Sequence, residues 1–198
     1  MQKLKNNPSL LFIGLGNPGL VYHETRHNAG FMVIDKLVDK LSFKYKNPFF
    51  KNYLVAQGLF QNQQIVIIKP MTFMNNSGLI FNYLPGKYIN NNTKVVVVSD
   101  NMDLSLGECR IKNKGSNSSH NGMSSIINSY GSGDFLRVYV GVSKPAEGET
   151  VISHVLGKCE ESDFLVFQKG IERASNAAYS LITHDVQRVM NEYNRRNN

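Results

Sequence analysis

The chain has 198 residues, which is the usual size of one folded domain and enough to bury a core without disulfides or metal ions. Hydrophobic residues make up 41% and charged residues 19%, with no low-complexity tract and no repeat, so the disordered and solenoid classes are excluded. The net charge of +7 favours contact with a polyanion such as RNA or DNA, although a lysine-rich solvated surface would give the same balance.

Hydropathy and cysteine usage predict a cytoplasmic location. No apolar run approaches the roughly 18 to 20 residues that a bilayer span needs, and the polar start MQKLKNNPS lacks the apolar region of a signal peptide. Cys109 and Cys159 form no CxxC pair and lie far apart in sequence. We therefore expect both to be free thiols with packing roles.

Five short apolar or alternating runs predict strands: LLFIGLG at 10–16, YLVAQGLF at 53–60, QIVIIK at 64–69, KVVVVSD at 94–100 and LRVYVGV at 136–142. The four valines at 95–98 indicate a central strand that is covered on both faces. Helical spacing occurs over 31–41, with Asn28 as its N-cap, and two more helices are expected over 160–182 and 186–196.

This succession of strands and helices predicts an α/β fold, in which residues 1–198 form a single domain with a mixed twisted sheet and helices on both faces. Functional groups in such a fold collect on the loops beyond the strand ends. Asn17, Asn75 and Asp100 each follow a predicted strand. We therefore expect these three side chains to lie near a common site.

Gly14, Gly16 and Gly19 fit GxGxxG, which after a strand is the fingerprint of dinucleotide binding. That fingerprint needs a helix that starts at the third glycine, whereas LVYHETR follows here, and no acidic residue ends a strand about 20 positions later. A tight turn, in which the glycines supply positive φ angles and Pro18 keeps Asn17 extended, explains the pattern better.

His23, Glu24 and His27 spell HETRH, a literal match to the HExxH motif of zinc proteases. Zinc catalysis requires both histidines on one helical face and a third protein ligand, but Val33 occupies the position of the third histidine, and no Glu occurs between Glu24 and Glu108. The apolar periodicity begins only after His27, which places HETRH in a loop. We therefore expect no metal site.

A more specific pattern is spread along the chain. GLGNPG at 14–19, Tyr22, TRHNAG at 25–30, KPMTFMNNSG at 69–78, SDNMDL at 99–104, SHNG at 119–122 and VISHVLGK at 151–158 occur in this order. In order and spacing these blocks resemble the motifs of bacterial-type peptidyl-tRNA hydrolases, and they cover nearly the whole chain. The resemblance implies a phosphorylase/hydrolase-like fold and an esterase that needs no cofactor.

The resemblance also implies a mechanism. His27 would take a proton from a water molecule, which attacks the ester joining the peptide to the 3′ ribose of tRNA. Histidine suits this task because its ordinary pKa, about 6.5, leaves a neutral base near pH 7. Asp100 would orient the ring and stabilise the imidazolium, as in a triad in which water replaces the serine.

By the same resemblance, Asn17 would distinguish an N-blocked aminoacyl group from a free amine, Asn75 would position the reacting carbonyl and water, and Asn121 would contact substrate and water. Amide side chains suit these roles because they donate and accept hydrogen bonds without charge. Tyr22, Phe73 and Met74 would line the cleft. His120 would be a structural residue that orients its loop.

The partner implied is peptidyl-tRNA, bound by a monomer without a membrane or an obligate protein partner. Arg110, Lys112 and Lys114 alternate on a strand-like segment, so we expect one basic stripe, with phosphate contacts from Arg110, Lys112 and Arg137. A solvated edge strand is the alternative. The loop NKGSNSS at 113–119 and Tyr139 depart from the family, which usually has a glycine run and a second basic residue there. An RNA-binding relative without hydrolytic activity and the HExxH zinc hydrolase remain as alternative functions.

Overall fold

The computed structural model describes residues 10–115 and 119–195. Six strands form one sheet in the order β2-β3-β1-β4-β6-β5. They are β1 (Leu10–Gly14), β2 (Tyr53–Phe60), β3 (Gln63–Pro70), β4 (Lys94–Asn101), β5 (Cys109–Lys112) and β6 (Leu136–Gly141). The four inner strands are parallel, and β2 and β5 pair antiparallel at the two edges. The expected α/β class with a mixed sheet is confirmed.

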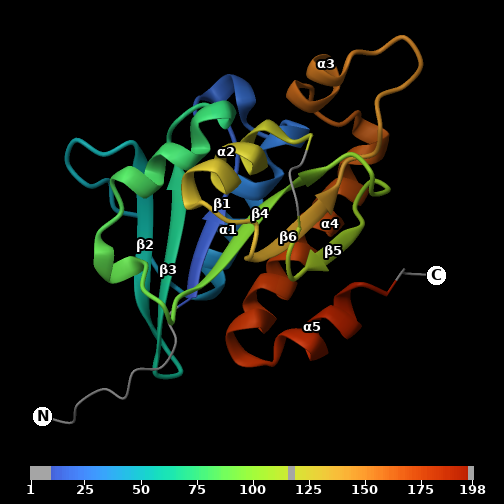
Figure 1. The fold of residues 1–198 in the computed structure, drawn as a ribbon. Coiled ribbons are helices and arrows are strands. Elements are labelled where there is room, and N and C mark those ends of the chain that lie inside the picture. The colour runs from blue at the N-terminus through green and yellow to red at the C-terminus, as the bar shows by residue number, and fades with distance from the viewer. Residues whose placement is uncertain (1–9, 116–118, 196–198) are drawn as a thin grey trace, which may run out of the picture.

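Helices cover both faces of this sheet, with α2 in front and with α1 and α4 behind in Figure 1. The α-helices are α1 (Ala29–Lys40), α2 (Asn121–Tyr130), α3 (Val151–Leu156), α4 (Glu161–Thr183) and α5 (Val186–Tyr193). The 3-10 helices are η1 (Leu20–Tyr22), η2 (Arg26–Asn28), η3 (Met74–Asn82) and η4 (Gly86–Tyr88). Within the described ranges, no helix has the length and apolar character that crossing a membrane would require.

Successive residues of the central strands alternate between two hydrophobic clusters. Phe12 and Val96 pack with α1 and α4 on one face, and Ile13 and Val97 pack with α2 on the other. Strand residues point alternately to the two faces, and here both faces are buried, so a continuous apolar run results. The valines at 95–98 are all buried, which confirms the central strand predicted from them.

The expected helices over 160–182 and 186–196 correspond to α4 and α5, although α5 ends at Tyr193 and Arg196 lies outside the described residues. Asn28 is the N-cap residue of α1, as expected, but its side chain makes no capping hydrogen bond to that helix. Its Oδ1 instead accepts the backbone N–H of Asn17 at 2.8 Å, and its Nδ2 donates to the carbonyl of Asn17 at 3.0 Å. Asn28 therefore holds the loop that follows β1.

The start of α1 lies directly against the ends of β1 and β4. Phe31 donates its backbone N–H to the carbonyl of Leu15, and Leu15 donates to the carbonyl of Val98. Gly30 faces these same groups, and a Cβ there would overlap the backbone of Leu15 and Val98. Because backbone atoms cannot move aside as a flexible side chain can, this close approach requires glycine.

We expect Gly30→Ala to lower the free energy of unfolding by about 3 kcal/mol, because the methyl group must push α1 away from two strand ends. Gly86→Ala is the matched control, since its Cβ would enter open space. Urea denaturation of the two variants measures the difference. Equal stability of both variants would show that the α1 contact can relax.

Candidate active site

A pocket of about 440 Å³ opens at the carboxyl end of the parallel strands. All eight residues expected to take part in catalysis or substrate binding line it: Asn17, Tyr22, His27, Phe73, Met74, Asn75, Asp100 and Asn121. They come from four regions that are far apart in sequence, at 17–27, 73–75, 100 and 121. The pocket forms where it does because parallel strands end at one edge of the sheet, and the loops beyond them converge there.

His27 and Asp100 are in direct contact. The Nδ1 atom of His27, on η2, lies 3.0 Å from Oδ1 of Asp100 at the end of β4. The His27 side chain is 12% exposed and faces the pocket, whereas that of Asp100 is 2% exposed. This geometry leaves Nε2 of His27 as the nitrogen that can reach a pocket water.

His120 makes a second contact with the same carboxylate oxygen. Its Nε2 lies 2.9 Å from Oδ1 of Asp100, and the two imidazole rings are 4.8 Å apart between centroids. Burial alone would raise the pKa of Asp100, but the neighbouring imidazoles of His120 and His27 hold this pKa well below its usual range. Asp100 is therefore an anionic acceptor for both rings, a role for His120 that the sequence did not indicate.

His27, Asp100 and His120 place one ligand atom each within 4.8 Å of one another, so we tested whether they suit a metal ion. In the structure Nδ1 of His120 accepts the backbone N–H of Met123 at 3.2 Å. A metal bound at Nε2 of His120 would leave the ring proton on Nδ1, facing that N–H. The three residues therefore do not fit a metal unless the start of α2 rearranges.

Asn17 is buried, and its orientation is fixed by two neighbours. Asn28 holds its backbone on both sides, and Oδ1 of Asn17 accepts the backbone N–H of Met74 at 2.8 Å. Because that N–H can only donate, the amide oxygen must face Met74. Asn17 can therefore offer its Nδ2 donor to the pocket.

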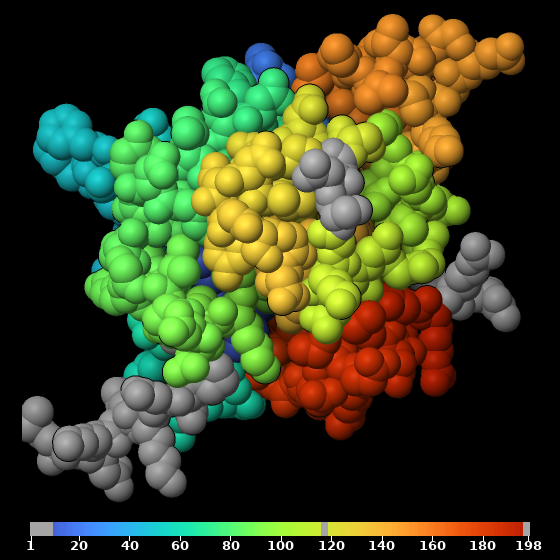
Figure 2. Space-filling model, in the orientation of Figure 1, coloured from blue at the N-terminus to red at the C-terminus, as the bar shows by residue number. Residues whose placement is uncertain are grey.

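One wall of the pocket is apolar and comes from α3, which contributes Val151, Ile152, Val155 and Leu156. The orange segment that contains α3 projects from the body of the molecule in Figure 2. The block VISHVLGK at 151–158 resembles the family's motif, but the resemblance did not indicate this wall. The available signal was Thr150, whose side chain caps α3, followed by an apolar run.

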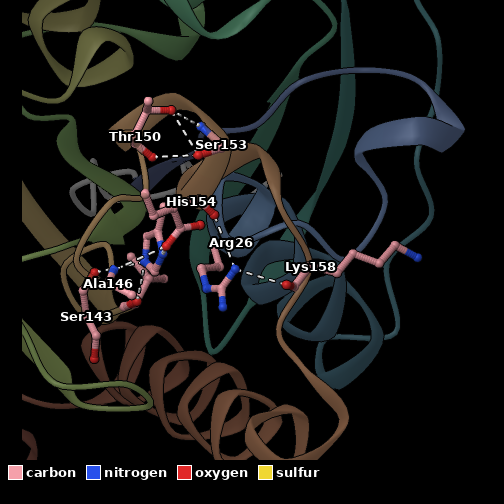
Figure 3. A network of polar contacts seen from close by, with 9 residues as sticks. Arg26, Ser143, Ala146, Thr150, Ser153, His154 and Lys158 are labelled. Carbon is pink, nitrogen blue, oxygen red and sulfur yellow. Dashed lines mark hydrogen bonds and ion pairs between the residues drawn. The ribbon is translucent and has the colours of Figure 1, made fainter.

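α3 is tied to the rest of the site at both ends (Figure 3). The buried ring of His154, within α3, contacts the segment before the helix: Glu149 at 3.0 Å and the carbonyls of Val142 and Ser143 at 3.0 and 3.1 Å. At its end, the guanidinium of Arg26 donates to the carbonyls of His154 and Lys158. Since Arg26 directly precedes His27, the pocket wall is fastened to the segment that carries the proposed base.

The expected basic stripe is present only in part. On β5, Lys112 is exposed, and its Nζ lies 5.9 Å from the ring centre of Tyr139, whereas Arg110 is paired with Glu108. The expectation of a phosphate contact from Arg137 is not supported. Its side chain is 1% exposed and donates to the carbonyls of Gly115, Gly133 and Phe135.

Both departures from the family also lie beside this stripe. Tyr139 is buried and lines the pocket instead of presenting a charge. In the loop at 113–119, positions 116–118 lie outside the described residues.

Neither of the two alternative motifs forms the site that its pattern requires. HETRH lies in a turn that leads into η2, and the side chain of His23 is 70% exposed beside Glu24. After Gly19 the chain forms the single 3-10 turn η1 and not an α-helix. Gly16 instead makes room for the ring of Phe31. Gly19 has the positive φ angle that the tight turn predicted, whereas Gly14 and Gly16 are not at positive φ and serve close packing, which the sequence did not predict.

Comparison with known proteins agrees with the geometry of the pocket. The profile of the family described as peptidyl-tRNA hydrolase matches residues 11–198. The chain belongs to the peptidyl-tRNA hydrolase family. A peptidyl-tRNA hydrolase of Thermoanaerobacter sp. (strain X514) is 42% identical over 181 residues, which cover 91% of this chain and 97% of that one. One of Caldanaerobacter subterraneus subsp. tengcongensis is 40% identical over 184 residues, which cover 93% and 98%.

A solved structure agrees as well. The crystal structure of peptidyl-tRNA hydrolase from Acinetobacter baumannii superimposes with a TM-score of 0.80 at 29% identity and covers 95% of each chain. As a member of the peptidyl-tRNA hydrolase family, the chain is a hydrolase that acts on the ester bond of peptidyl-tRNA. These findings do not favour the zinc hydrolase or the RNA-binding relative without activity.

Proposed function

We propose that this chain releases peptides from peptidyl-tRNA with His27 as the general base and Asp100 as the residue that orients it. The observation that carries this proposal is the 3.0 Å contact between Nδ1 of His27 and Oδ1 of Asp100, both of which line the pocket. A proton on Nδ1 donates to the carboxylate, so Nε2 has a lone pair available for a water proton.

The proposed reaction uses one water molecule. His27 takes a proton as the water oxygen attacks the ester carbonyl, and the positive charge that forms on the ring is stabilised by Asp100. When the bond to the ribose oxygen breaks, the proton passes to that oxygen, which gives the peptide acid and a free tRNA 3′ end. Asn75 and Asn121 would hold the carbonyl and the water, and Tyr22, Phe73 and Met74 would enclose the peptide.

We expect His27→Ala to lower kcat by roughly 10² to 10⁴, the usual contribution of a general base, while tRNA binding is retained. Turnover of N-acetyl-aminoacyl-tRNA measures this effect, and Asp100→Asn should also slow the reaction because an amide stabilises imidazolium less well. Addition of EDTA should leave the wild-type rate unchanged. Loss of activity on chelation, with zinc bound in the purified protein, would falsify the mechanism and favour the HETRH alternative.

We further propose that Asn17 selects N-blocked substrates. The Nδ2 donor that it can offer to the pocket complements the carbonyl oxygen of a blocking group or of a preceding peptide residue. A free aminoacyl group presents an ammonium, which has only donors and would face this donor unfavourably. Selection of the blocked substrate by this uncharged hydrogen-bond donor agrees with the role that the resemblance implies for Asn17.

Asn17→Asp should narrow the preference for blocked over unblocked aminoacyl-tRNA, because one carboxylate oxygen can keep the Met74 contact while the other attracts an ammonium. Asn17→Ala, which removes both contacts, is the companion variant. The ratio of kcat/KM values for the two substrates is the quantity to compare. An equal loss on both substrates in both variants would mean that Asn17 only holds its loop.

We propose that tRNA lies against the exposed Lys112 side of β5, with Arg110 as a secondary contact and with Arg137 excluded by its burial. Lys112→Ala should then weaken binding to all tRNAs and reduce the slope of log affinity against log salt by up to about one unit, because one counterion fewer is released. Lys36→Ala is a matched control, since Lys36 is ion-paired with Glu172 on the opposite face of the sheet. If the slope is unchanged in Lys112→Ala, the basic stripe does not bind tRNA phosphate and is an ordinary solvated edge strand.

We propose as well that residues 1–198 act as one domain, in the cytoplasm, as a monomer without a cofactor or an obligate protein partner. The pocket supports this proposal because a single chain supplies every side chain that the mechanism uses. The molar mass from light scattering, measured at the nanomolar to micromolar enzyme concentrations used for turnover, tests whether the protein is a monomer. Specific activity that rises with protein concentration would contradict it.

A further inference from the structure

Two of the contacts that His120 makes together fix the position of its ring proton. It precedes α2 as the N-cap residue, and its Nδ1 accepts the backbone N–H of Met123 at 3.2 Å. A backbone N–H can only donate, so Nδ1 must carry a lone pair. The ring proton is then on Nε2, where it donates to Oδ1 of Asp100 at 2.9 Å.

The same carboxylate oxygen accepts a hydrogen bond from His27. One anionic atom therefore binds two imidazoles, although the proposed mechanism requires that only one of them gain a proton. Two similar rings on one carboxylate would ordinarily titrate as a coupled pair. The environments of the two rings must differ if the catalytic proton is to be taken up by His27 alone.

We propose that His120 is a positioning residue that orients Asp100 toward His27. The first turn of α2 keeps the ring of His120 neutral, so the catalytic proton is taken up by His27. A second proton on His120 would have to occupy Nδ1, opposite the N–H of Met123. It would also place a positive charge at the amino end of α2, where the helix dipole is unfavourable to cations. In His27 it is Nδ1 that lies against Asp100, so a proton taken up by this ring is added at Nε2 and does not face the N–H of Met123.

The ionisable groups that line the pocket together with His120 are Tyr22 on η1, His27 on η2, Asp100 at the end of β4, Asp103 after β4, and Tyr139 on β6. Of these, Asp100 contacts both rings through one oxygen atom, so this carboxylate by itself does not distinguish them. The backbone N–H of Met123 against Nδ1 of His120 is a described contact that does distinguish them. The inference rests on the proposed role of His27 as the base.

The first test is NMR of the wild-type protein with ¹⁵N-labelled histidine, in which His27→Ala and His120→Asn assign the two rings. We expect His120 to show the neutral form with its proton on Nε2 throughout the pH range in which His27 becomes protonated. A proton on Nδ1 of His120, or protonation of His120 at or above the pH at which His27 is protonated, would overturn the proposal.

The second test is the pH profile of kcat/KM for His120→Asn on N-acetyl-aminoacyl-tRNA. Asparagine is a good N-cap and can keep the bond to Met123, but it is too short to reach Asp100. With one donor fewer, Asp100 should hold the His27 imidazolium more tightly. The acid limb should then move up by about half to one pH unit. That shift corresponds to a rate about three- to tenfold lower well below the midpoint of the limb.

Gly131→Ala is the control for a purely structural role of His120. Gly131 ends α2 with φ of 78°, so alanine there strains the far end of the same helix without reaching Asp100. We expect a lower melting temperature with an unmoved acid limb. If the limb is unmoved or moves down in His120→Asn, the positioning role is wrong. If the proposed role of His27 is itself wrong, the His27→Ala variant will hydrolyse the substrate at the wild-type rate.

Discussion

The buried carboxylate of Asp100 organises the site, because a single oxygen accepts hydrogen bonds from His27 and His120. The two rings belong to segments that lie on either side of β4 in the chain, so neither can shift without breaking a contact at the end of the central strand. Both imidazoles stabilise the anion, which is why Asp100 remains charged although it is excluded from solvent. In turn, this anion accepts the Nδ1 proton of His27 and so gives the ring a defined tautomer.

Backbone packing provides the precision that this arrangement needs. Gly30 lets α1 begin in contact with the ends of β1 and β4, which brings His27 within reach of Asp100. Asn28 then uses its side chain to hold the backbone of Asn17 on both sides. Residues next to the reactive groups thus serve as supports, and the reactive groups themselves need no unusual conformation.

The fold class, the central strand and the long helix over 161–183 could be predicted from sequence, because continuous burial and helical periodicity leave direct patterns. The eight side chains predicted from the family motifs do line one pocket. Their catalytic roles stay predictions. Contacts between distant segments were not predictable. Asn28 occupies the N-cap position predicted for it, yet its side chain binds the backbone of Asn17 and not that of the helix. Arg137 reads as a surface cation on an alternating strand, but three carbonyls bind it inside the protein.

The attachment of α3 has a consequence for how the protein can change. Arg26 binds the end of this helix and is adjacent to His27, so the apolar wall of the pocket and the proposed general base are joined through one side chain. Under the proposed mechanism, natural variation or engineering that reshapes this wall to admit a different peptide would also move the imidazole. Substrate range and turnover rate would then change together, and a broadened pocket would need compensating changes around Arg26 to remain fast.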